Sequence, residues 1–229
     1  MMMFPHDSSI VLVFIAMIIA MGAQLRVKST FDRYSRVGTR RGVTADQVAR
    51  MLLDRFGLTS VDVKRVAGQL TDHYDPRDRS LSLSDSVYGN ASIAAIGVAA
   101  HEVGHAIQHN VGYAPLGIRN SIVPAVNLGS AMAIPIFFVG FLFQGPVLME
   151  IGILLFLGVV IFHLITLPVE FNASSRAVAI LRQTGALEGQ ELEGAGSVLN
   201  AAAWTYIAAT VVAVAQLIRL IAKRNSSRR

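Results

Sequence analysis

The sequence predicts a mainly α-helical integral membrane protein, with about four transmembrane helices and a small α+β domain inserted between the first and the second. Of its 229 residues, 53% are hydrophobic and only 15% are charged, whereas soluble globular domains carry about a quarter charged residues. The apolar residues gather in four runs, and the polar stretch between the first two runs changes between helical and strand periodicity. The chain contains no cysteine, which excludes disulfides, Cys-ligated metals and thiol catalysis.

Four apolar runs approach or reach the roughly 20 residues that a helix needs to cross a bilayer. They cover residues 10–25, 122–143, 147–167 and 204–222. Only three residues separate the second run from the third, so a tight transmembrane hairpin is expected over residues 121–168. The fourth run is interrupted by polar residues near its end. Residues 204–229 are therefore predicted to form a transmembrane or membrane-associated helix with a basic tail.

Residues 1–25 are expected to form a retained transmembrane anchor. A cleaved signal peptide begins with positively charged residues, and residues 1–9 contain neither Lys nor Arg. Cleavage near the small residues Ala20 to Gly22 is the alternative.

The hairpin returns the chain to the side from which it entered, so the polar stretches on either side of it share one side of the membrane. Glu150, the acidic residue of the third run, lies near the hairpin turn, where the membrane interface can solvate it. An excess of basic residues near the spans marks the cytoplasmic side. Nine lie with the polar stretches, namely Arg26, Lys28, Arg33, Arg36, Arg40, Arg41, Arg119, Arg176 and Arg182. Four lie on the opposite side if the last run spans, namely Lys223, Arg224, Arg228 and Arg229. This balance predicts a cytoplasmic polar domain, and the basic tail is the discordant observation.

Within residues 26–120 the pattern predicts a helix, then strands, then a longer helix. Thr44 has the position of an N-cap, apolar residues follow it at helical spacing, and Gly57 ends the run. Residues 61–63 and 80–84 alternate as half-buried strands do. The segment Asp75 to Asp78 between them is typical of a turn.

An alanine-rich helix is expected over residues 92–110, and it carries the pattern His-Glu-x-x-His at residues 101–105. His101 and His105 are slightly more than one helical turn apart, so both imidazoles project from one face and can bind one metal ion. Glu102 is then placed to abstract a proton from a metal-bound water rather than to bind the metal. The alternative, a helix with two incidental histidines, leaves a charged Glu102 in a buried helix unexplained.

A third protein ligand is expected, because catalytic zinc sites usually combine three protein ligands with a water. Glu170 is the preferred candidate, since it follows the third apolar run on the same side of the membrane as the histidines. The alternative role of Glu170 is that of an acidic residue near a helix start, where the helix dipole favours a negative charge. His109 lies about 12 Å from His101 along the helix and cannot join the same ion. His6 and His73 are weaker candidates. Three further glutamates are expected in an ordinary solvated loop: Glu188, Glu191 and Glu193.

Four sequence blocks together make a family recognisable: Ala99–Gln108, Leu167–Ser174, Asp72–Pro76 and Ala201–Tyr206. Over nearly the whole chain, the sequence resembles the YugP-like family of small bacterial membrane neutral zinc metallopeptidases, whose sites are of the gluzincin type. The resemblance implies that residues 26–120 form a zincin-like domain and that residues 169–203 supply a helix with the third ligand, followed by a loop. It implies one Zn²⁺ per chain, bound by His101, His105 and Glu170, with Glu102 as the catalytic base.

The sequence departs from the more distantly similar membrane peptidases at one position. In those proteins an Asp usually follows the ligand Glu by four residues and steadies a ligand histidine. Here that position is Ser174. Ser174 or Asn172 could supply the hydrogen bond instead, with weaker electrostatic support.

The expected function is that of a membrane-embedded zinc endopeptidase that hydrolyses peptide bonds by Glu-assisted attack of zinc-bound water. The candidate donors to the tetrahedral oxyanion are His73, Tyr74 and Tyr206, which position alone does not rank. His163, within the third run, either lines an access route through the membrane or is hydrogen-bonded between helices. The alternative functions are a catalytically inactive zinc-binding scaffold and, less favoured, a transporter subunit.

The expected location is the bacterial cytoplasmic membrane, which the chain crosses several times with the site facing the cytoplasm. The expected partners are a membrane-associated peptide or protein substrate and the lipid bilayer. Nucleic acid is not expected, because no face combines basic and aromatic residues. Small residues in the second run could pack helices within the chain, in a homo-oligomer or against another membrane protein: Gly129, Ser130, Ala131 and Ala133.

Overall fold

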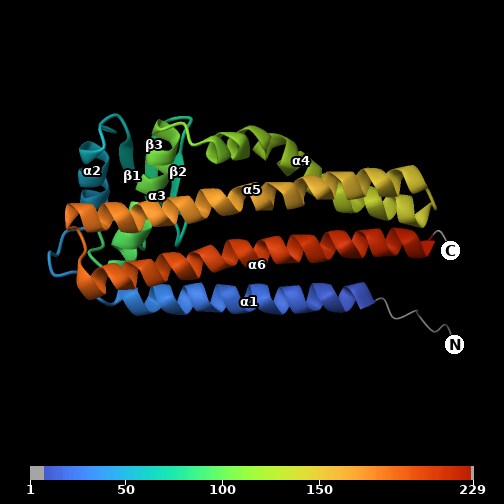
Figure 1. Ribbon diagram of the computed structural model, residues 1–229, viewed down its shortest axis with the longest axis horizontal. Helices are drawn as coiled ribbons and strands as arrows, with labels where there is room; N and C mark the ends of the chain where they lie inside the picture. Colours follow the sequence, from blue (N-terminus) through green and yellow to red (C-terminus); the bar gives the residue numbers. More distant parts are fainter. Residues whose placement is uncertain (1–7, 228–229) are drawn as a thin grey trace. The chain divides into compact units, whose positions relative to one another are not determined.

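The computed structural model describes residues 8–227 and is mainly helical, with one small sheet (Figure 1). Its elements in chain order are α1 (Ser8–Ser35), α2 (Ala45–Arg55), β1 (Asp62–Val66), β2 (His73–Asp75), β3 (Ser80–Ser84), α3 (Ile93–Asn110), α4 (Ala114–Leu142), α5 (Pro146–Thr184) and α6 (Gly189–Ser227). Four of these helices, α1, α4, α5 and α6, are long and apolar enough to cross a membrane. The predicted class, a mainly helical protein with four candidate spans and a small sheet, is thus confirmed.

The described backbone divides into two units. A helical unit comprises the described parts of residues 1–24, 118–167 and 205–229, and a sheet unit comprises residues 25–117 and 168–204. The helices α1, α5 and α6 each contribute one segment to both units.

In the helical unit, α4 and α5 form a hairpin with almost no space between the backbones. The backbone N–H of Gly145 donates to the carbonyl of Gly140 across the turn, at 2.8 Å. A Cβ added to Gly152 would lie 2.8 Å from the carbonyl oxygen of Ala133 and 2.7 Å from the Cβ of Phe137. Gly129 and Ala133 therefore serve the packing of α4 on α5, whereas Ser130 and Ala131 are exposed in this structure.

A partly buried ion pair joins the end of α6 to the start of α5 within the helical unit. Arg224 Nη1 lies 2.7 and 2.9 Å from the two carboxylate oxygens of Glu150. The sequence did not predict this partner for Glu150: one guanidinium nitrogen of the basic tail contacts both carboxylate oxygens. Arg228 and Arg229 of that tail lie outside the described residues.

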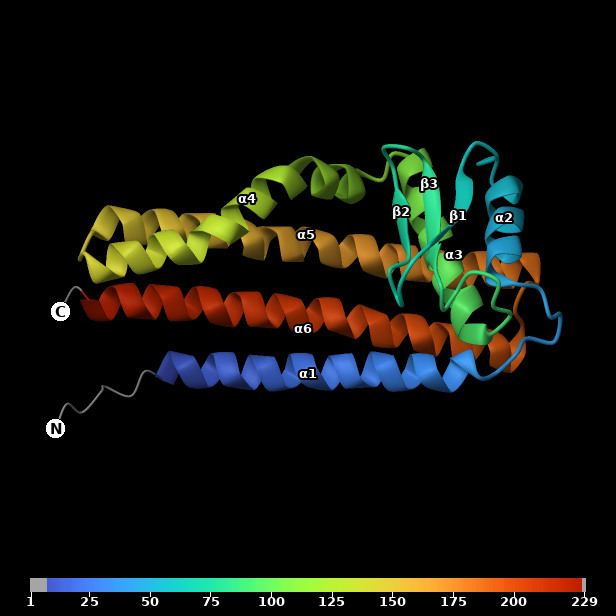
Figure 2. The ribbon, with the colours of Figure 1, turned by 180° about the vertical axis from the view of Figure 1, so that it is seen from behind.

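In the sheet unit, β3 lies between β1 and β2, as Figure 2 shows from behind. β1 pairs with β3 in parallel and β2 pairs with it in antiparallel orientation. All five residues of β3 are buried. The prediction of a half-buried strand at residues 80–84 is therefore wrong, because a central strand covered on both faces buries its polar positions too. The hydroxyls of Ser80 and Ser84 are satisfied there by Asp78 and Asp72.

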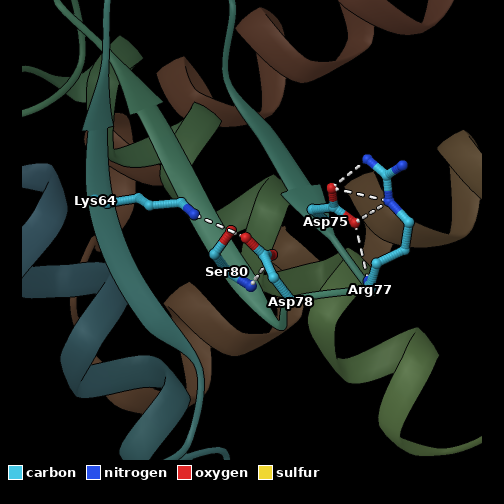
Figure 3. A network of polar contacts seen from close by, with 5 residues as sticks. All are labelled: Lys64, Asp75, Arg77, Asp78 and Ser80. Atoms are coloured by element: carbon cyan, nitrogen blue, oxygen red, sulfur yellow. Dashed lines mark hydrogen bonds and ion pairs between the residues drawn. The ribbon is translucent and has the colours of Figure 1, made fainter.

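The predicted turn between β2 and β3 is held by the polar network in Figure 3. Asp78 accepts hydrogen bonds from the backbone N–H and hydroxyl of Ser80, at 3.1 and 2.6 Å, and from Lys64 Nζ of β1 at 2.8 Å. Arg77 binds Asp75, and its hydrogen bonds lower the pKa of that carboxyl group to about 2. These contacts thus hold the turn that connects β2, at the edge of the sheet, to the central strand β3.

The two predicted helices of the sheet unit are confirmed with their caps. The backbone N–H of Thr44 donates to Gln47 Oε1 at the start of α2, and the hydroxyl of Ser92 accepts from the N–H of Ala95 at the start of α3. Their apolar faces meet β3, α5 and α6 in one core, represented by Leu52, Leu81, Ile96, Leu181 and Val198. This core fixes the position of α3, which carries the His-Glu-x-x-His pattern.

The long helices extend well beyond the predicted spans. α1 continues to Ser35, and α6 begins at Gly189 rather than near residue 204. Glu191 and Glu193, which were expected in a solvated loop, are therefore helical, and Glu191 Oε1 accepts a hydrogen bond from the N–H of Arg40 at 2.8 Å. The polar residues that follow or precede an apolar run mark the end of the apolar surface. They do not mark the end of the helix, because a helix can continue with polar residues outside a membrane.

Replacing Gly152 by alanine is expected to destabilise the helical unit by about 1–3 kcal/mol, because the added Cβ meets backbone and a buried ring carbon that cannot move freely. Gly158→Ala is the matched control on the same helix, since no atom lies within 4 Å of its Cβ position. Thermal unfolding of both variants in the same detergent measures the difference. Equal melting temperatures would contradict the observed hairpin packing.

Candidate metal centre

α3 and α5 touch through their backbones at one point of the sheet unit. A Cβ added to Gly104 would lie 2.6 Å from the carbonyl oxygen and 3.2 Å from the Cα of Ala173. Alanines above and below this point, Ala100 and Ala177, are completely buried. Because only small residues line the crossing, side chains that flank it on the two helices come within direct contact.

The crossing brings His101 and His105 of α3 to Glu170 of α5. Glu170 Oε2 lies 3.3 Å from His101 Nε2 and 3.7 Å from His105 Nε2. One ligand atom from each of the three residues lies within 4.8 Å of the other two. His105 and Glu170 are buried, at 8% and 3% exposure, and His101 is nearly so. The structure thus places the three predicted ligands together.

The other nitrogen of each imidazole is occupied by a neighbouring side chain. His101 Nδ1 lies 3.2 Å from the hydroxyl of Ser174, and His105 Nδ1 lies 3.0 Å from Gln108 Oε1. An Nδ1–H that donates to Gln108 leaves the Nε2 lone pair of His105 directed at Glu170. The hydrogen bond that the sequence assigned to Ser174 or Asn172 is therefore made to His101 by Ser174.

Gln108 is the site residue that the sequence reasoning missed. It is completely buried, and its Nε2 donates to the carbonyl of Val169 at 2.8 Å and to Asn172 Oδ1 at 3.0 Å. Asn172 also accepts from Arg176 at 2.7 Å. The available signal was position, since Gln108 follows His105 by three residues on the same helical face.

The donor set fits a zinc ion. Two imidazoles and a carboxylate, each imidazole held by an outer hydrogen bond, are a usual catalytic zinc arrangement. Burial disfavours a charged His105, but its hydrogen bond with Glu170 and the charges of Glu102 and Glu170 outweigh burial and raise its pKa. The same concentration of negative charge favours a divalent cation.

The other predicted site residues of the sheet unit are Glu102, Tyr74 and His73. Glu102 is buried on α3 beside His101, with 7% exposure. The hydroxyl of Tyr74 lies 2.8 Å from Nδ1 of the exposed His109, in the last turn of α3, which agrees with the interpretation of His109 as a satisfied surface residue. His73 is exposed, and its Nδ1 lies 2.9 Å from the carbonyl of Thr71.

Tyr206 and His163 belong to the helical unit, whereas the three ligands belong to the sheet unit. Their expected roles, as an oxyanion donor and as part of an access route, stay predictions. His6 lies outside the described residues.

The described residues thus combine four helices that could span a membrane with a His-His-Glu cluster that could hold a metal ion. The family model described as "Putative neutral zinc metallopeptidase" matches residues 9–225, and the chain belongs to this family. It is 48% identical over 200 residues to a Bacillus subtilis (strain 168) protein named "Putative membrane protease YugP", a match that covers 87% of this chain and 88% of the relative. No solved structure matches the chain.

Replacing Gly104 by alanine is expected to abolish most metal binding, because the added Cβ must push α3 away from the backbone of Ala173 and so separate the histidines from Glu170. Gly97→Ala is the matched control on α3, since its Cβ would lie 3.3 Å from the Cβ and 3.4 Å from the Cα of Ala195, a much milder overlap than at Gly104. Both changes favour the helix. Zinc content after purification measures the outcome, and equal content in the two variants would contradict the role of the crossing.

Proposed function

We propose that this protein is a membrane-embedded zinc-dependent endopeptidase. The observation that carries the proposal is the orientation of the two histidines. Each directs Nε2 toward Glu170 Oε2, and each has Nδ1 beside an oxygen of another side chain. Membership in a zinc metallopeptidase family supports zinc as the metal.

In this proposal His101, His105 and Glu170 hold the zinc ion, and Glu102 is the catalytic base. Zinc bound there supplies Lewis acidity for hydrolysis of a peptide bond. Glu102 accepts a proton from the attacking water and delivers it to the leaving amine. Its place supports this role, because it is buried next to a ligand histidine and its charge acts on His105. Gln108 Oε1 can only accept, so it keeps His105 in the tautomer with the Nε2 lone pair free, while the hydroxyl of Ser174 holds the ring of His101 in place.

We also propose that the sheet, α2 and α3 form a zincin-like domain within residues 26–120, inserted between the first and second spans. The order of elements supports it, since all strands lie between α1 and α4 in the chain. The further proposed divisions are the anchor at residues 1–25, the hairpin at 121–168, the third-ligand helix at 169–203 and the last helix at 204–229.

The proposed substrates are membrane or membrane-associated proteins. Support comes from the candidate spans of this chain and from its relative, which is named a membrane protease. The proposed location is the bacterial cytoplasmic membrane, with the metal centre facing the cytoplasm. The excess of basic residues around the polar stretches supports this orientation. The ion pair between Glu150 and Arg224 supports a last helix that runs back to the level of the α4–α5 turn.

A zinc-binding membrane scaffold without catalysis is the second candidate, since the same ligands would serve it. It differs from a peptidase in what Glu102 does, because a scaffold does not need a base beside the metal. A transporter subunit is less favoured, as it leaves the buried His-His-Glu cluster unexplained.

The Glu102→Gln variant is expected to retain zinc and to lose roughly 10²- to 10⁴-fold in peptidase activity, because the amide cannot accept the proton. Glu170→Ala is expected to lose zinc. Metal content and cleavage of casein or a membrane protein, with and without a chelator, measure both. Wild-type activity in Glu102→Gln would remove Glu102 from the mechanism. Zinc-loaded wild-type protein without activity would favour the scaffold, and unchanged zinc in Glu170→Ala would exclude Glu170 as a ligand.

The proposed orientation can be tested with single cysteines, because the chain has none of its own. Three exposed positions are suitable: Gln69 in the sheet unit, Gln144 in the hairpin turn and Ser226 at the end of α6. An impermeant maleimide added to intact cells is expected to label Gln144→Cys and Ser226→Cys, and Gln69→Cys only after permeabilisation. Labelling of Gln69→Cys from outside would reverse the orientation. Protection of Ser226→Cys alone would show that the last helix does not cross.

A further inference from the structure

A cavity of about 580 Å³ lies between α1 and α6 within the sheet unit. The two helices lie side by side there in both views (Figures 1 and 2). They approach closely because a Cβ added to Gly194 of α6 would lie 2.7 Å from the ring of Tyr34 of α1. Next to this contact the cavity forms an open groove between the two helices. Its charged lining residues are Arg26, Arg33 and Glu193.

The positions of the two arginines of the groove favour the binding of an anion. Arg26 and Arg33 are seven residues apart on α1, so they share one face of the helix. Both are exposed, and within residues 8–227 neither forms an ion pair with a carboxylate, although Arg33 lies 5.4 Å from the ring centroid of Tyr34. Guanidinium groups bind phosphate through paired hydrogen bonds. The amide of Asn200 on α6 lines the same groove and offers further donors.

The serine and threonine hydroxyls in the groove already donate within their own helices. Ser29 and Thr30 both donate to the carbonyl of Arg26, at 3.1 and 2.7 Å, and Ser197 donates to the carbonyl of Glu193 at 2.9 Å. Glu193 is an exposed carboxylate that opposes an anion. The three charged groups leave the groove with one net positive charge, which is suited to a single phosphodiester.

The groove lies where both helices change from polar to apolar sequence. Arg26 directly follows the apolar residues 10–25 of α1, and Asn200 directly precedes the apolar part of α6. One turn beyond Asn200, the single tryptophan of the chain, Trp204, is 45% exposed. Tryptophan is enriched at the membrane–water interface, where lipid headgroups lie. The depth of the groove therefore favours a lipid phosphate over a phosphate from solution.

We propose that this groove binds the headgroup phosphate of an anionic phospholipid, held by Arg26, Arg33 and Asn200. The lipid chains then lie beside Trp204, along the apolar parts of α1 and α6. The site is independent of the proposed peptidase activity, because it shares no residue with the metal centre. An anionic lipid bound there would fix the height of the sheet unit relative to the bilayer.

The test uses Trp204 fluorescence of the full chain in phosphatidylcholine vesicles. Brominated phosphatidylglycerol is expected to quench Trp204 more than brominated phosphatidylcholine does at equal mole fraction. Arg26→Gln is expected to weaken the preference about tenfold, because it removes a charge-assisted hydrogen bond to the phosphate. Lys28→Gln is the matched control, since it removes the same charge from α1 outside the groove-lining residues. Glu193→Gln is expected to strengthen the preference.

Three outcomes would overturn the proposal. An equal loss in Arg26→Gln and Lys28→Gln would indicate diffuse attraction to the surface rather than a site. Equal quenching by brominated phosphatidylethanolamine would show that the groove does not select an anionic headgroup. Removal of the preference by excess inorganic phosphate would show that free phosphate is the ligand. Unchanged quenching by brominated phosphatidylcholine in every variant controls for folding and insertion.

Discussion

The contact between α3 and α5 at Gly104 and Ala173 is the constraint on which the candidate metal centre depends. Two histidines on one helix and a glutamate 69 residues away from His101 can share an ion only if the helices approach closely. The distance between packed helices is set by the side chains at their contact. A glycine facing an alanine backbone brings the helices to their closest approach, so the long side chains that flank the contact meet. The alanine-rich composition of α3 therefore serves the site as much as the core.

The same packing explains how the imidazoles are oriented. A buried polar side chain must find partners, because an unpaired one is costly. Gln108 satisfies this requirement by binding His105, the carbonyl of Val169 and Asn172 at once. Its hydrogen bonds thus join the histidine helix to the helix of Glu170. Ser174 of α5 likewise contacts a histidine of α3, since its hydroxyl lies beside His101 Nδ1. This neutral group orients the ring without adding a negative charge to that of Glu170.

The parts of the structure that follow from local periodicity were predicted well. The helix over residues 92–110 and the pair His101 and His105 depend only on neighbours within a few turns. Glu170 was found by a topological step, because the hairpin returns it to the side of the histidines. The errors concern partners distant in sequence. Burial on both faces of β3 and the pairing of Glu150 with Arg224 leave no local signal.

By itself, the sequence determined the apolar runs that could span a membrane, the order of the main elements and the two histidines of one helical face, since all of these rest on composition and spacing along the chain. Only the tertiary structure decided which carboxylate meets those histidines, that Gln108 orients one of them and that Ser174, rather than Asn172, contacts the other. The physical reason is that helical periodicity fixes which way a side chain points, while the distance between two helices depends on the smallest residues where they cross.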